Sequence, residues 1–560
     1  MITNTTTQSQ ILLSNISRII EFNASKIIEN VELRFDQYIS VINVVLNNST
    51  YYTQSNSTVG IATKPVPKGY VPFILITYII YAIFIVIVLA QLLTMMHSAY
   101  ARLRVMKNAG SSISNVGWLP LVSVIIPVKG EGIDAIEDAV KRIIGLDYPR
   151  DKLEVIVATD DDEATANLIK STVERIGRVY GLRTLVNWRS KPIGYKGGAI
   201  NEAAKLARGD VLLILDVDTT LPRNYLKVAL NYLNEGYDAV GAPFLGTPKV
   251  PNSFSWPLMI LFNILSEIQI VGRALSRFRR GFYMIIGNNL LIRREFFNRI
   301  NGLCYCKSDD IDIALRIWLM GGRIGIMNER VLTEIPSTYS AFRSQTIRWA
   351  TNDMWALKRY FMEILKSRNR GVIDKVDAYL WLLKYPLVYL GVISIVTMII
   401  MQVFNILIPP LPILVLSILT DVVGVALLIM IIMVGRRMNY GYWDLFKSLI
   451  VGGLTMYALT FPLMIYLAKA LLSDLPWLYT PKASKALLRQ KFIIERSSII
   501  ALIVLGVVLF MMGHVIVSLY VFANSLLILM GYRIGTINPV NRLGHSNNDY
   551  ILSNLASNLN

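Results

Sequence analysis

Three acidic motifs between residues 118 and 370 could act on a phosphorylated substrate. Asp216 and Asp218 end the apolar run DVLLILDVD, and two carboxylates at positions i and i+2 can converge on a hard divalent cation and its phosphate oxygens. Asp160 opens an acidic triplet after a second apolar run, and SDD (308–310) precedes a helix-like stretch. Because the three histidines are scattered and there are only two cysteines, we expect carboxylates to hold any metal.

Basic and aromatic residues complete this set. Lys196 stands beside two glycines in IGYKGGAIN (193–201), where the free amides of a helix start and an ammonium group suit a diphosphate. QTIRW (345–349) supplies an amide, an arginine for a phosphate and an indole for the apolar face of a sugar ring. Each motif also has an ordinary structural interpretation, because acidic residues are common at strand ends and Asp309 or Asp310 could cap the following helix.

Alternating strand-like and helix-like segments surround these motifs. Short β-branched runs predict buried parallel strands at 121–128, 153–159 and 210–218. Helical stretches are expected between and beside them, at 133–144, 163–179 and 197–207. Such units form a doubly wound α/β sheet that binds ligands at the carboxyl ends of its strands. We therefore expect the acidic motifs, which follow the strands, to lie together.

The composition places this α/β region in a membrane protein. Among 560 residues, 54% are hydrophobic and 17% charged, and the mean hydropathy of +0.47 excludes a fully soluble protein. The net charge of +18 is typical of cytoplasmic loops rich in Lys and Arg, so we do not expect nucleic acid as a partner. Two cysteines, Cys304 and Cys306, cannot form a disulfide framework.

Uncharged segments predict several membrane crossings. Residues 71–96 are the first, and the basic residues after them (Arg102, Arg104 and Lys107) indicate that the α/β region is cytoplasmic. Further spans are expected at 385–408 and 413–434, and 498–531 suits two short helices that turn near Gly513. Both flanks of 448–472 are basic, so we favour an interfacial or re-entrant segment broken at Pro462 over a plain crossing.

The first 70 residues are expected on the outer side. This tail carries acceptor triplets for N-glycosylation, whereas none follows the first span, and together with the absence of an expected disulfide this suits an archaeal cell surface. The triplets begin at Asn4, Asn15, Asn23, Asn47, Asn48 and Asn56.

The ordered set KGGAIN, DVD, SDD and QTIRW, followed by spans, resembles the membrane-integrated family 2 glycosyltransferases. These include the cellulose, chitin, hyaluronan and poly-N-acetylglucosamine synthases. The resemblance covers about residues 118–500, and WLYTPK (477–482) is similar to the FxVTxK gating loop of cellulose synthases. It implies a GT-A-like catalytic domain that uses Mg²⁺ or Mn²⁺ and a nucleotide sugar, with a UDP-sugar as the first expectation.

The resemblance also implies a role for individual residues. Asp310 would be the general base and Asp218 the metal ligand, while Gln345 and Trp349 would bind the acceptor. The donor nucleotide would be bound by Asp160, Lys196, Asp216, Arg348, Thr480 and Lys482. Three departures from the family pattern stand out: SDD in place of TED, Thr346 where Gln or Arg is usual, and Trp477 and Tyr479 in place of Phe and Val.

These expectations give a complete domain order for a multi-pass protein of the cell membrane, with its N-terminus outside and its C-terminus in the cytoplasm. The regions are an external tail (1–70), a transmembrane helix (71–96), a cytoplasmic linker (97–117), the catalytic domain (118–370), an interfacial segment with two transmembrane helices (371–434), a cytoplasmic interfacial helix with the gating loop (435–497), two transmembrane helices (498–531) and a cytoplasmic tail (532–560).

Three functions are compatible with the resemblance. The first is an inverting, processive transfer of sugars onto a polysaccharide that is exported across the membrane. The second is the transfer of a single sugar to a membrane lipid, and the third is an inactive membrane scaffold. WLYTPK and the apolar segment before it favour the polysaccharide, and the intact acidic set argues against the scaffold. The sequence leaves the sugar and the oligomeric state open.

Overall fold

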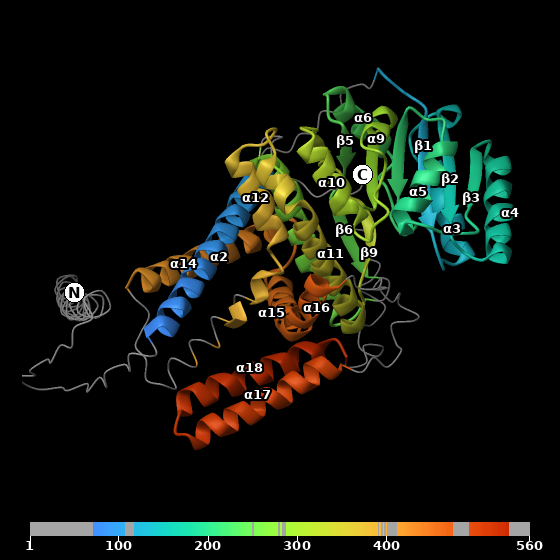
Figure 1. Ribbon diagram of the computed structural model, residues 1–560. Helices are drawn as coiled ribbons and strands as arrows, with labels where there is room; N and C mark the ends of the chain where they lie inside the picture. The colour runs from blue at the N-terminus through green and yellow to red at the C-terminus, as the bar shows by residue number, and fades with distance from the viewer. Residues whose placement is uncertain are drawn as a thin grey trace, which may run out of the picture. The chain divides into compact units, whose positions relative to one another are not determined.

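The computed structural model describes most of the chain between residues 71 and 536 (Figure 1). The described residues are 71–106, 117–248, 251–277, 281–282, 287–389, 391–393, 396, 399, 411–473 and 492–536. The chain divides into two compact units, and the sheet with its surrounding helices belongs to the unit formed by Ile87–Val392 and Val422–Asn560.

A mixed seven-stranded sheet is the centre of the α/β region. The strand order is β3-β2-β1-β4-β7-β5-β8. The strands are β1 (Val122–Val128), β2 (Leu153–Thr159), β3 (Arg183–Trp188), β4 (Val211–Leu215), β5 (Ala239–Gly241), β7 (Asn289–Arg293) and β8 (Ile324–Ile326). The first four run parallel to one another, whereas β7 pairs antiparallel with both β4 and β5. A second, two-stranded parallel sheet joins β6 (Phe244–Pro248) to β9 (Val331–Ile335).

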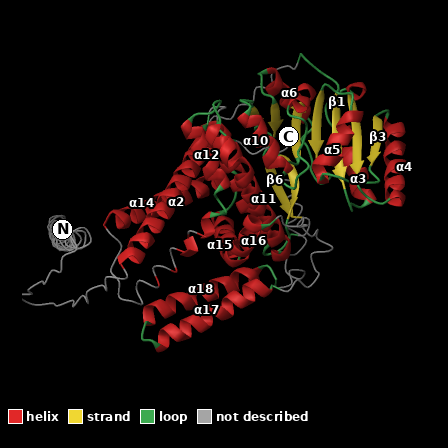
Figure 2. Ribbon diagram, in the orientation of Figure 1, coloured by secondary structure: helices red, strands yellow, loops and turns green. Residues whose placement is uncertain are grey.

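Helices cover both faces of the large sheet (Figure 2). On one face, Val124 and Ile126 of β1 pack in the same core as α3 (Ile133–Ile144), α4 (Glu163–Tyr180) and α6 (Tyr225–Asn234). On the other face, Ile125 packs with α5 (Tyr195–Leu206) and α10 (Asp309–Leu319). Since successive side chains of a strand point to opposite faces, both faces of β1 must be apolar, as its sequence predicted.

The predicted doubly wound α/β architecture is confirmed, and its strands and helices begin and end within a few residues of their expected positions. The antiparallel β7 was not anticipated, because a short apolar run has the same pattern in either direction. The edge strand β3 was also missed, since its residues are only partly buried and it lacks a continuous apolar run. DVD differs from expectation as well: β4 ends at Leu215, and Asp216 lies in a turn in which its carbonyl accepts from Thr219.

Five helices among the described residues are long and apolar enough to cross a membrane: Ile76–Met106, Ser255–Ser276, Val415–Arg437, Ile493–Met511 and Val517–Ile534. The first is part of α2 (Val71–Met106), which continues past the predicted end at 96. The third lies in α14 (Leu411–Arg437), and most of the predicted span 385–408 lies outside the described residues. Ser255–Ser276 was not predicted as a span, and 61% of its most apolar window is buried inside the protein.

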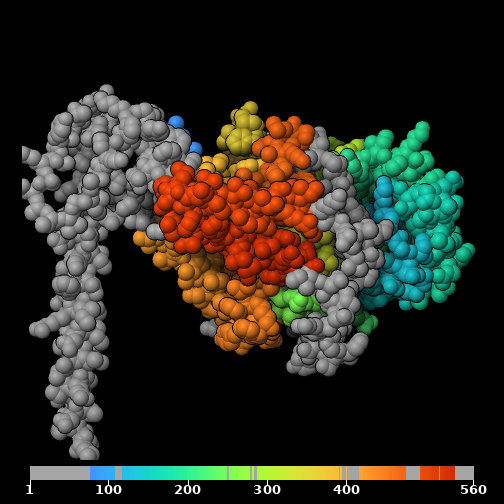
Figure 3. All heavy atoms as spheres, turned by 90° about the horizontal axis from the view of Figure 1, so that it is seen from below, coloured from blue at the N-terminus to red at the C-terminus, as the bar shows by residue number. Residues whose placement is uncertain are grey.

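The C-terminal helices confirm one predicted turn and correct another. α17 (Ile493–Met511) and α18 (Val515–Ile534) are joined at Gly513, whose φ of 84° favours glycine, and both lie at the surface in Figure 3. α15 (Tyr442–Ala458) and α16 (Thr460–Leu472) meet at a bend of 48°. The break is therefore at Leu459 and not at the predicted Pro462, because a proline in the first turn of a helix removes no helical hydrogen bond.

Candidate active site

Lys196 and Asp216 meet at the carboxyl ends of the parallel strands. Lys196 follows the start of α5, whose N-cap Gly194 has a φ of 81°, and its Nζ donates to Asp216 Oδ1 at 2.7 Å. The same Nζ donates to the carbonyl oxygen of Gly287 at 2.9 Å, and the amide of Asp216 donates to the carbonyl of Asn288 at 3.0 Å. Gly287 and Asn288, which precede β7, therefore connect Lys196, the predicted diphosphate ligand, to the turn that contains Asp216.

Asp310 lies against the same short segment. It stands in the first turn of α10, after the N-cap Ser308, and its Oδ1 accepts from the amide of Ile311 at 2.8 Å. A Cβ on Gly287 would lie 2.9 Å from the Cβ of Asp310, so glycine permits this close approach. The carbonyl that accepts from Lys196 and the backbone that contacts Asp310 thus belong to one residue, Gly287, which sequence reasoning missed.

Burial and mutual repulsion alter the protonation of this acidic pair. The pKa of Asp309 is raised to about 6: burial is the largest cause, Asp310 and Asp216 also raise it, and Lys196 lowers it. Burial also raises the pKa of Asp310, against the Ile311 amide, Lys196 and Arg348. A carboxyl group with a raised pKa binds a proton more strongly, as a general base must.

The same carboxylates alter the pKa values of two basic side chains, Lys196 and Arg348. Burial lowers the pKa of Lys196, but Asp216, Asp309 and Asp310 outweigh it, and the net pKa is raised. Burial lowers the pKa of Arg348, and the same three carboxylates partly restore it. The structure therefore brings four of the predicted site residues, Lys196, Asp216, Asp310 and Arg348, into one electrostatic cluster with Asp309.

Asp160, which directly follows β2, is linked to the start of α5 by an arginine that the sequence did not single out. Arg189 donates from Nε to Asp160 Oδ1 at 2.7 Å and from Nη2 to Oδ2 at 2.6 Å, and both side chains are less than 10% exposed. Arg189 also donates to the carbonyls of Ile193 at 2.7 Å and Tyr195 at 3.2 Å. The position of Arg189 directly after β3 could have signalled this role, had that strand been recognised.

Asp218, the predicted metal ligand, has a different basic neighbour from Asp216. Its charge raises the pKa of Arg142 on α3, against the larger lowering by burial, and Arg142 donates to the carbonyl of Val217 at 2.6 Å. The two carboxylates thus face groups from different helices, because the chain turns at 216–219 where an extended strand was expected.

Gln345, Arg348 and Trp349 share one face of α11 (Tyr339–Lys366), as their i, i+3 and i+4 spacing requires. The Trp349 ring packs edge to face on Phe262, with 6.2 Å between the centroids. Within the described residues, Gln345 Oε1 and the hydroxyl of the 2% exposed Thr346 are buried without a hydrogen-bond partner. Buried polar groups without partners carry a free-energy cost, and such groups are therefore suited to an incoming hydroxyl.

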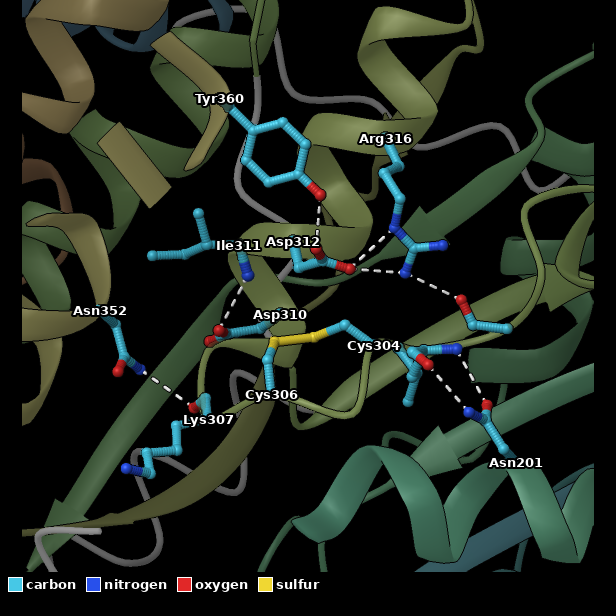
Figure 4. Close-up of a disulfide and its surroundings, with 12 residues drawn as sticks. Asn201, Cys304, Cys306, Lys307, Asp310, Ile311, Asp312, Arg316, Asn352 and Tyr360 are labelled. Carbon is cyan, nitrogen blue, oxygen red and sulfur yellow. Dashed lines mark hydrogen bonds and ion pairs between the residues drawn. A yellow bond between two sulfur atoms is a disulfide. The ribbon is translucent and has the colours of Figure 1, made fainter. Parts of the chain in front are cut away.

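The two cysteines form a disulfide, which corrects the expectation that the chain has none (Figure 4). The sequence argument excluded a framework of several bridges and did not consider a single bridge between Cys304 and Cys306. Two other predicted site residues, Thr480 and Lys482, lie outside the described residues.

An open cavity of about 730 Å³ lies at the other end of the parallel strands, where Leu119 and Pro149 precede β1 and β2. Its lining includes Lys141, Arg150 and Lys227 but none of the residues that the sequence predicted for a site. We therefore place the candidate active site at the carboxyl ends.

Known proteins share this α/β region. Residues 123–300 match the family model described as Glycosyl transferase family 2. This stretch of the chain is therefore similar to family 2 glycosyltransferases. The mixed sheet is accordingly GT-A-like, as the resemblance implied.

The curated relatives are also glycosyltransferases. A probable glycosyltransferase of Sulfolobus acidocaldarius is 27% identical over 52% of this chain and 61% of its own length. The beta-monoglucosyldiacylglycerol synthase of Synechocystis sp. is 24% identical over 47% of this chain and 54% of its own. A probable glucomannan 4-beta-mannosyltransferase of Oryza sativa is 26% identical over 45% of this chain and 44% of its own. The chain thus spans between 44% and 61% of the lengths of these relatives.

Among solved structures, a mannosyltransferase of Pyrobaculum calidifontis in complex with GDP-Man and Mn²⁺ is similar, with a TM-score of 0.45 and 19% identity over 66% of this chain and 98% of that one.

Proposed function

We propose that this chain is an inverting glycosyltransferase that moves a sugar from a nucleotide-sugar donor to an acceptor hydroxyl. The observation that supports this proposal most strongly is the cluster of Lys196, Asp216, Asp310 and Arg348 within and beside the family 2 domain. Asp310 is partly buried beside two cations, and it combines a strong affinity for a proton with access to the edge of the sheet.

The reaction is a single displacement. The acceptor oxygen attacks the anomeric carbon while the bond from that carbon to the diphosphate oxygen breaks, and Asp310 takes the proton from the acceptor hydroxyl. The leaving nucleoside diphosphate gains negative charge, which the ammonium of Lys196 and the guanidinium of Arg348 stabilise. Asp160, fixed by Arg189, orients the nucleoside.

The residues after β4 fit a divalent cation. A Mg²⁺ or Mn²⁺ site at a phosphate commonly takes one or two carboxylates and fills its remaining positions with phosphate oxygens and water, and Asp218 offers one such carboxylate, since Asp216 accepts from Lys196. When bound there, the cation would neutralise charge on the diphosphate. The chain's own residues supply the rest of the site: Asp310 accepts the proton, and Lys196 contacts the diphosphate.

The enzyme is a multi-pass protein of the cell membrane in this proposal, with the catalytic domain and the C-terminus in the cytoplasm. α14 ends in Arg436 and Arg437, and α2 carries Arg102 and Arg104 near its C-terminal end. Basic residues at these helix ends favour the cytoplasmic side, where nucleotide sugars are made available.

A growing polysaccharide is the proposed acceptor. The bent pair α15 and α16 precedes WLYTPK, as an interfacial helix precedes the gating loop in the synthases that the sequence resembles. A membrane lipid is the second candidate, because one curated relative is named as a beta-monoglucosyldiacylglycerol synthase, whereas another, named as a glucomannan mannosyltransferase, supports the polysaccharide. The ordered acidic cluster argues against an inactive scaffold.

The size of the product separates these acceptors. The full chain in bilayer vesicles is incubated with radiolabelled nucleotide sugars, one at a time, and the products are separated by gel filtration after lipid extraction. Radioactive label in a long polymer supports the polysaccharide as the acceptor. Label in a lipid that carries a single sugar supports the membrane lipid instead. If no sugar is transferred above the level of Asp310→Asn, the scaffold is the correct description.

A further inference from the structure

The two cysteines lie in the segment 300–308, which connects α9 (Arg294–Arg299) to the catalytic helix α10. Cys304 and Cys306 are joined by a disulfide that encloses only Tyr305 between them (Figure 4). Both cysteines are partly exposed, and the Tyr305 side chain is 57% exposed. The bridge therefore lies within reach of small solutes.

One side of this bridged turn supports the helix of Lys196. A Cβ on Gly197 would lie only 2.2 Å from the carbonyl oxygen of Cys304, so the first turn of α5 rests directly on the backbone of the bridge. One turn further, the Asn201 side chain donates to the carbonyl of Leu303 at 2.8 Å and accepts from its amide at 2.9 Å. A shift of this turn would therefore displace the start of α5, which carries Lys196.

The other side is fixed to the helix of Asp310. Arg316 of α10 donates to the carbonyl of Gly302 at 2.8 Å and to that of Ile300. Asn352 of α11 donates to the carbonyl of Lys307 at 3.4 Å, and Ser308 follows as the N-cap of α10. The turn thus links the helix that presents Lys196 to the one that presents Asp310.

A metal site is the competing explanation for the sulfur pair. One oxygen of Asp312 lies within 4.8 Å of both sulfurs, which could suggest two thiolates and a carboxylate around an ion. Both oxygens of Asp312 are already engaged, however, by Tyr360 Oη at 2.5 Å and by Arg316 Nε at 2.7 Å and Nη2 at 2.5 Å. A metal would have to displace these donors, so we favour the sulfur–sulfur bond.

The bridge is poorly placed to stabilise the whole fold. The stabilisation that a disulfide provides through the unfolded state grows with the length of the enclosed loop, and this loop is among the shortest. Its effect must therefore be local. Disulfides that form on the cytoplasmic side, where the proposed topology places this domain, are usually transient, catalytic or redox-sensing, with those of hyperthermophiles as the exception.

We propose that the Cys304–Cys306 disulfide is a redox-controlled brace between the helices of Lys196 and Asp310. When the bridge is intact, the turn 303–307 holds the starts of α5 and α10 in their catalytic positions. A dithiol reductant supplies two electrons and two protons, the S–S bond breaks to give two thiols, and the reductant becomes a disulfide. The freed turn then loosens both helix starts.

Hydrogen exchange of the full chain in bilayer vesicles tests the brace. The chain is equilibrated with reduced or oxidised dithiothreitol, and maleimide labelling followed by mass spectrometry counts the free thiols. We expect reduction to increase amide exchange about tenfold at 195–201 and 302–312 and to leave β1 and β2 unchanged. The double variant Cys304→Ser/Cys306→Ser should exchange like the reduced chain under both conditions.

Three results would overturn the brace. They are equal exchange in the two verified redox states, redox dependence that persists in the double variant, and cysteines that stay as thiols under the oxidising condition. Each is independent of any activity of the enzyme.

The consequence for the donor rests on the proposed function. With UDP and GDP as probes in the presence of Mn²⁺, we expect nucleotide binding to weaken about three- to tenfold on reduction and to be unaffected by redox state in the double variant. If exchange responds but neither nucleotide binds in either state, the brace stands and the proposed function fails. If a nucleotide binds with equal affinity in both states, the brace has no control over the donor.

Discussion

The carboxyl edge of the sheet and the apolar helices depart from ordinary protein surfaces in opposite ways. At the sheet edge, carboxylates such as Asp309 are buried, whereas on α14 apolar side chains such as Val422 and Val425 are 60% and 58% exposed. A soluble protein would normally bury the second group and expose the first. In the proposed function, something outside the chain completes each of these places: a nucleotide sugar at the edge, and lipid around the helices.

The helical segment Ser255–Ser276 shows that composition alone does not decide between these environments. Its mean hydropathy over the most apolar window is 1.5 and that of Val415–Arg437 is 2.7, yet 61% of the first window is buried and only 11% of the second. Within it, Glu267 is 1% exposed and pairs with Arg102 at 2.6 Å and with Arg330. The segment therefore lies inside the protein, where Ile260 and Ile264 pack in one core with Leu427 of α14 and Leu445 of α15.

The largest effect is expected from the carboxyl edge. Asp310→Asn should lower the rate of sugar transfer about 1,000-fold, because it removes the proton acceptor, and should leave nucleotide binding intact. Steady-state kinetics and calorimetric binding of UDP and GDP measure the two quantities. Glu295→Gln is the matched control, since this carboxylate also stands in the first turn of a helix but is exposed and lies after β7. A variant that retains turnover would remove Asp310 from the role of base.

A second pair of substitutions compares the loss of stability at the buried apolar helix with that at the exposed one. Ile260→Ala removes a fully buried side chain of α7 (Ser255–Ser266) and should lower the free energy of unfolding by about 2–4 kcal/mol. Val425→Ala on α14 removes a side chain that faces outward and should cost less than about 1 kcal/mol, because lipid or detergent fills the space. Thermal denaturation in the same detergent compares them. Equal losses would show that α14 is also packed inside protein.

Neutralising Lys196 in the acidic cluster should weaken the binding of the donor and leave the fold intact. Lys196→Gln is expected to raise the Kd for UDP or GDP about 10- to 100-fold, the effect of losing a charge-assisted hydrogen bond of about 1.5–3 kcal/mol. The matched control on the same helix is Lys205→Gln, whose lysine is exposed and pairs with Glu202. If both variants bind alike, Lys196 does not contact the diphosphate.

The pH dependence of transfer tests the electrostatics of the acidic pair. Asp310 must be ionised to accept a proton, and burial raises its pKa, so the rate should begin to fall at a higher pH than the ordinary carboxyl value of about 4 would give. Asp309→Asn removes a neighbouring negative charge, lowers the pKa of Asp310 and should move this limb to lower pH. Rates between about pH 4.5 and 8 measure the shift. A limb that stays in place in the variant would show that the two carboxyls are uncoupled.

The regular elements could be predicted because their patterns are strong and local. The helix over 133–144 and the strand over 153–159 were predicted with their observed bounds, since periodicity and flanking residues suffice there. The partners of the site could not be predicted. Arg189 reaches Asp160 across 29 residues and Gly287 reaches Lys196 across 91, and such pairings depend on strand order.

The direction of one strand and the position of one helix bend were also missed. Nothing in a short apolar run marks β7 as antiparallel, and the bend lies at Leu459, before Pro462 in the first turn of α16. The resemblance to family 2 glycosyltransferases rests on the order of the motifs along the chain, and it grouped residues that local patterns could not.

The proposed function requires the carboxyl edge of the sheet to bind a nucleotide sugar and transfer its sugar. The most direct measurement is the release of nucleoside diphosphate from a panel of nucleotide sugars by the full chain in bilayer vesicles with Mn²⁺, beside Asp310→Asn. We expect at least one donor to release its nucleoside diphosphate at a rate about 1,000-fold above that of the variant. Equal rates for the chain and the variant with every donor would contradict the account.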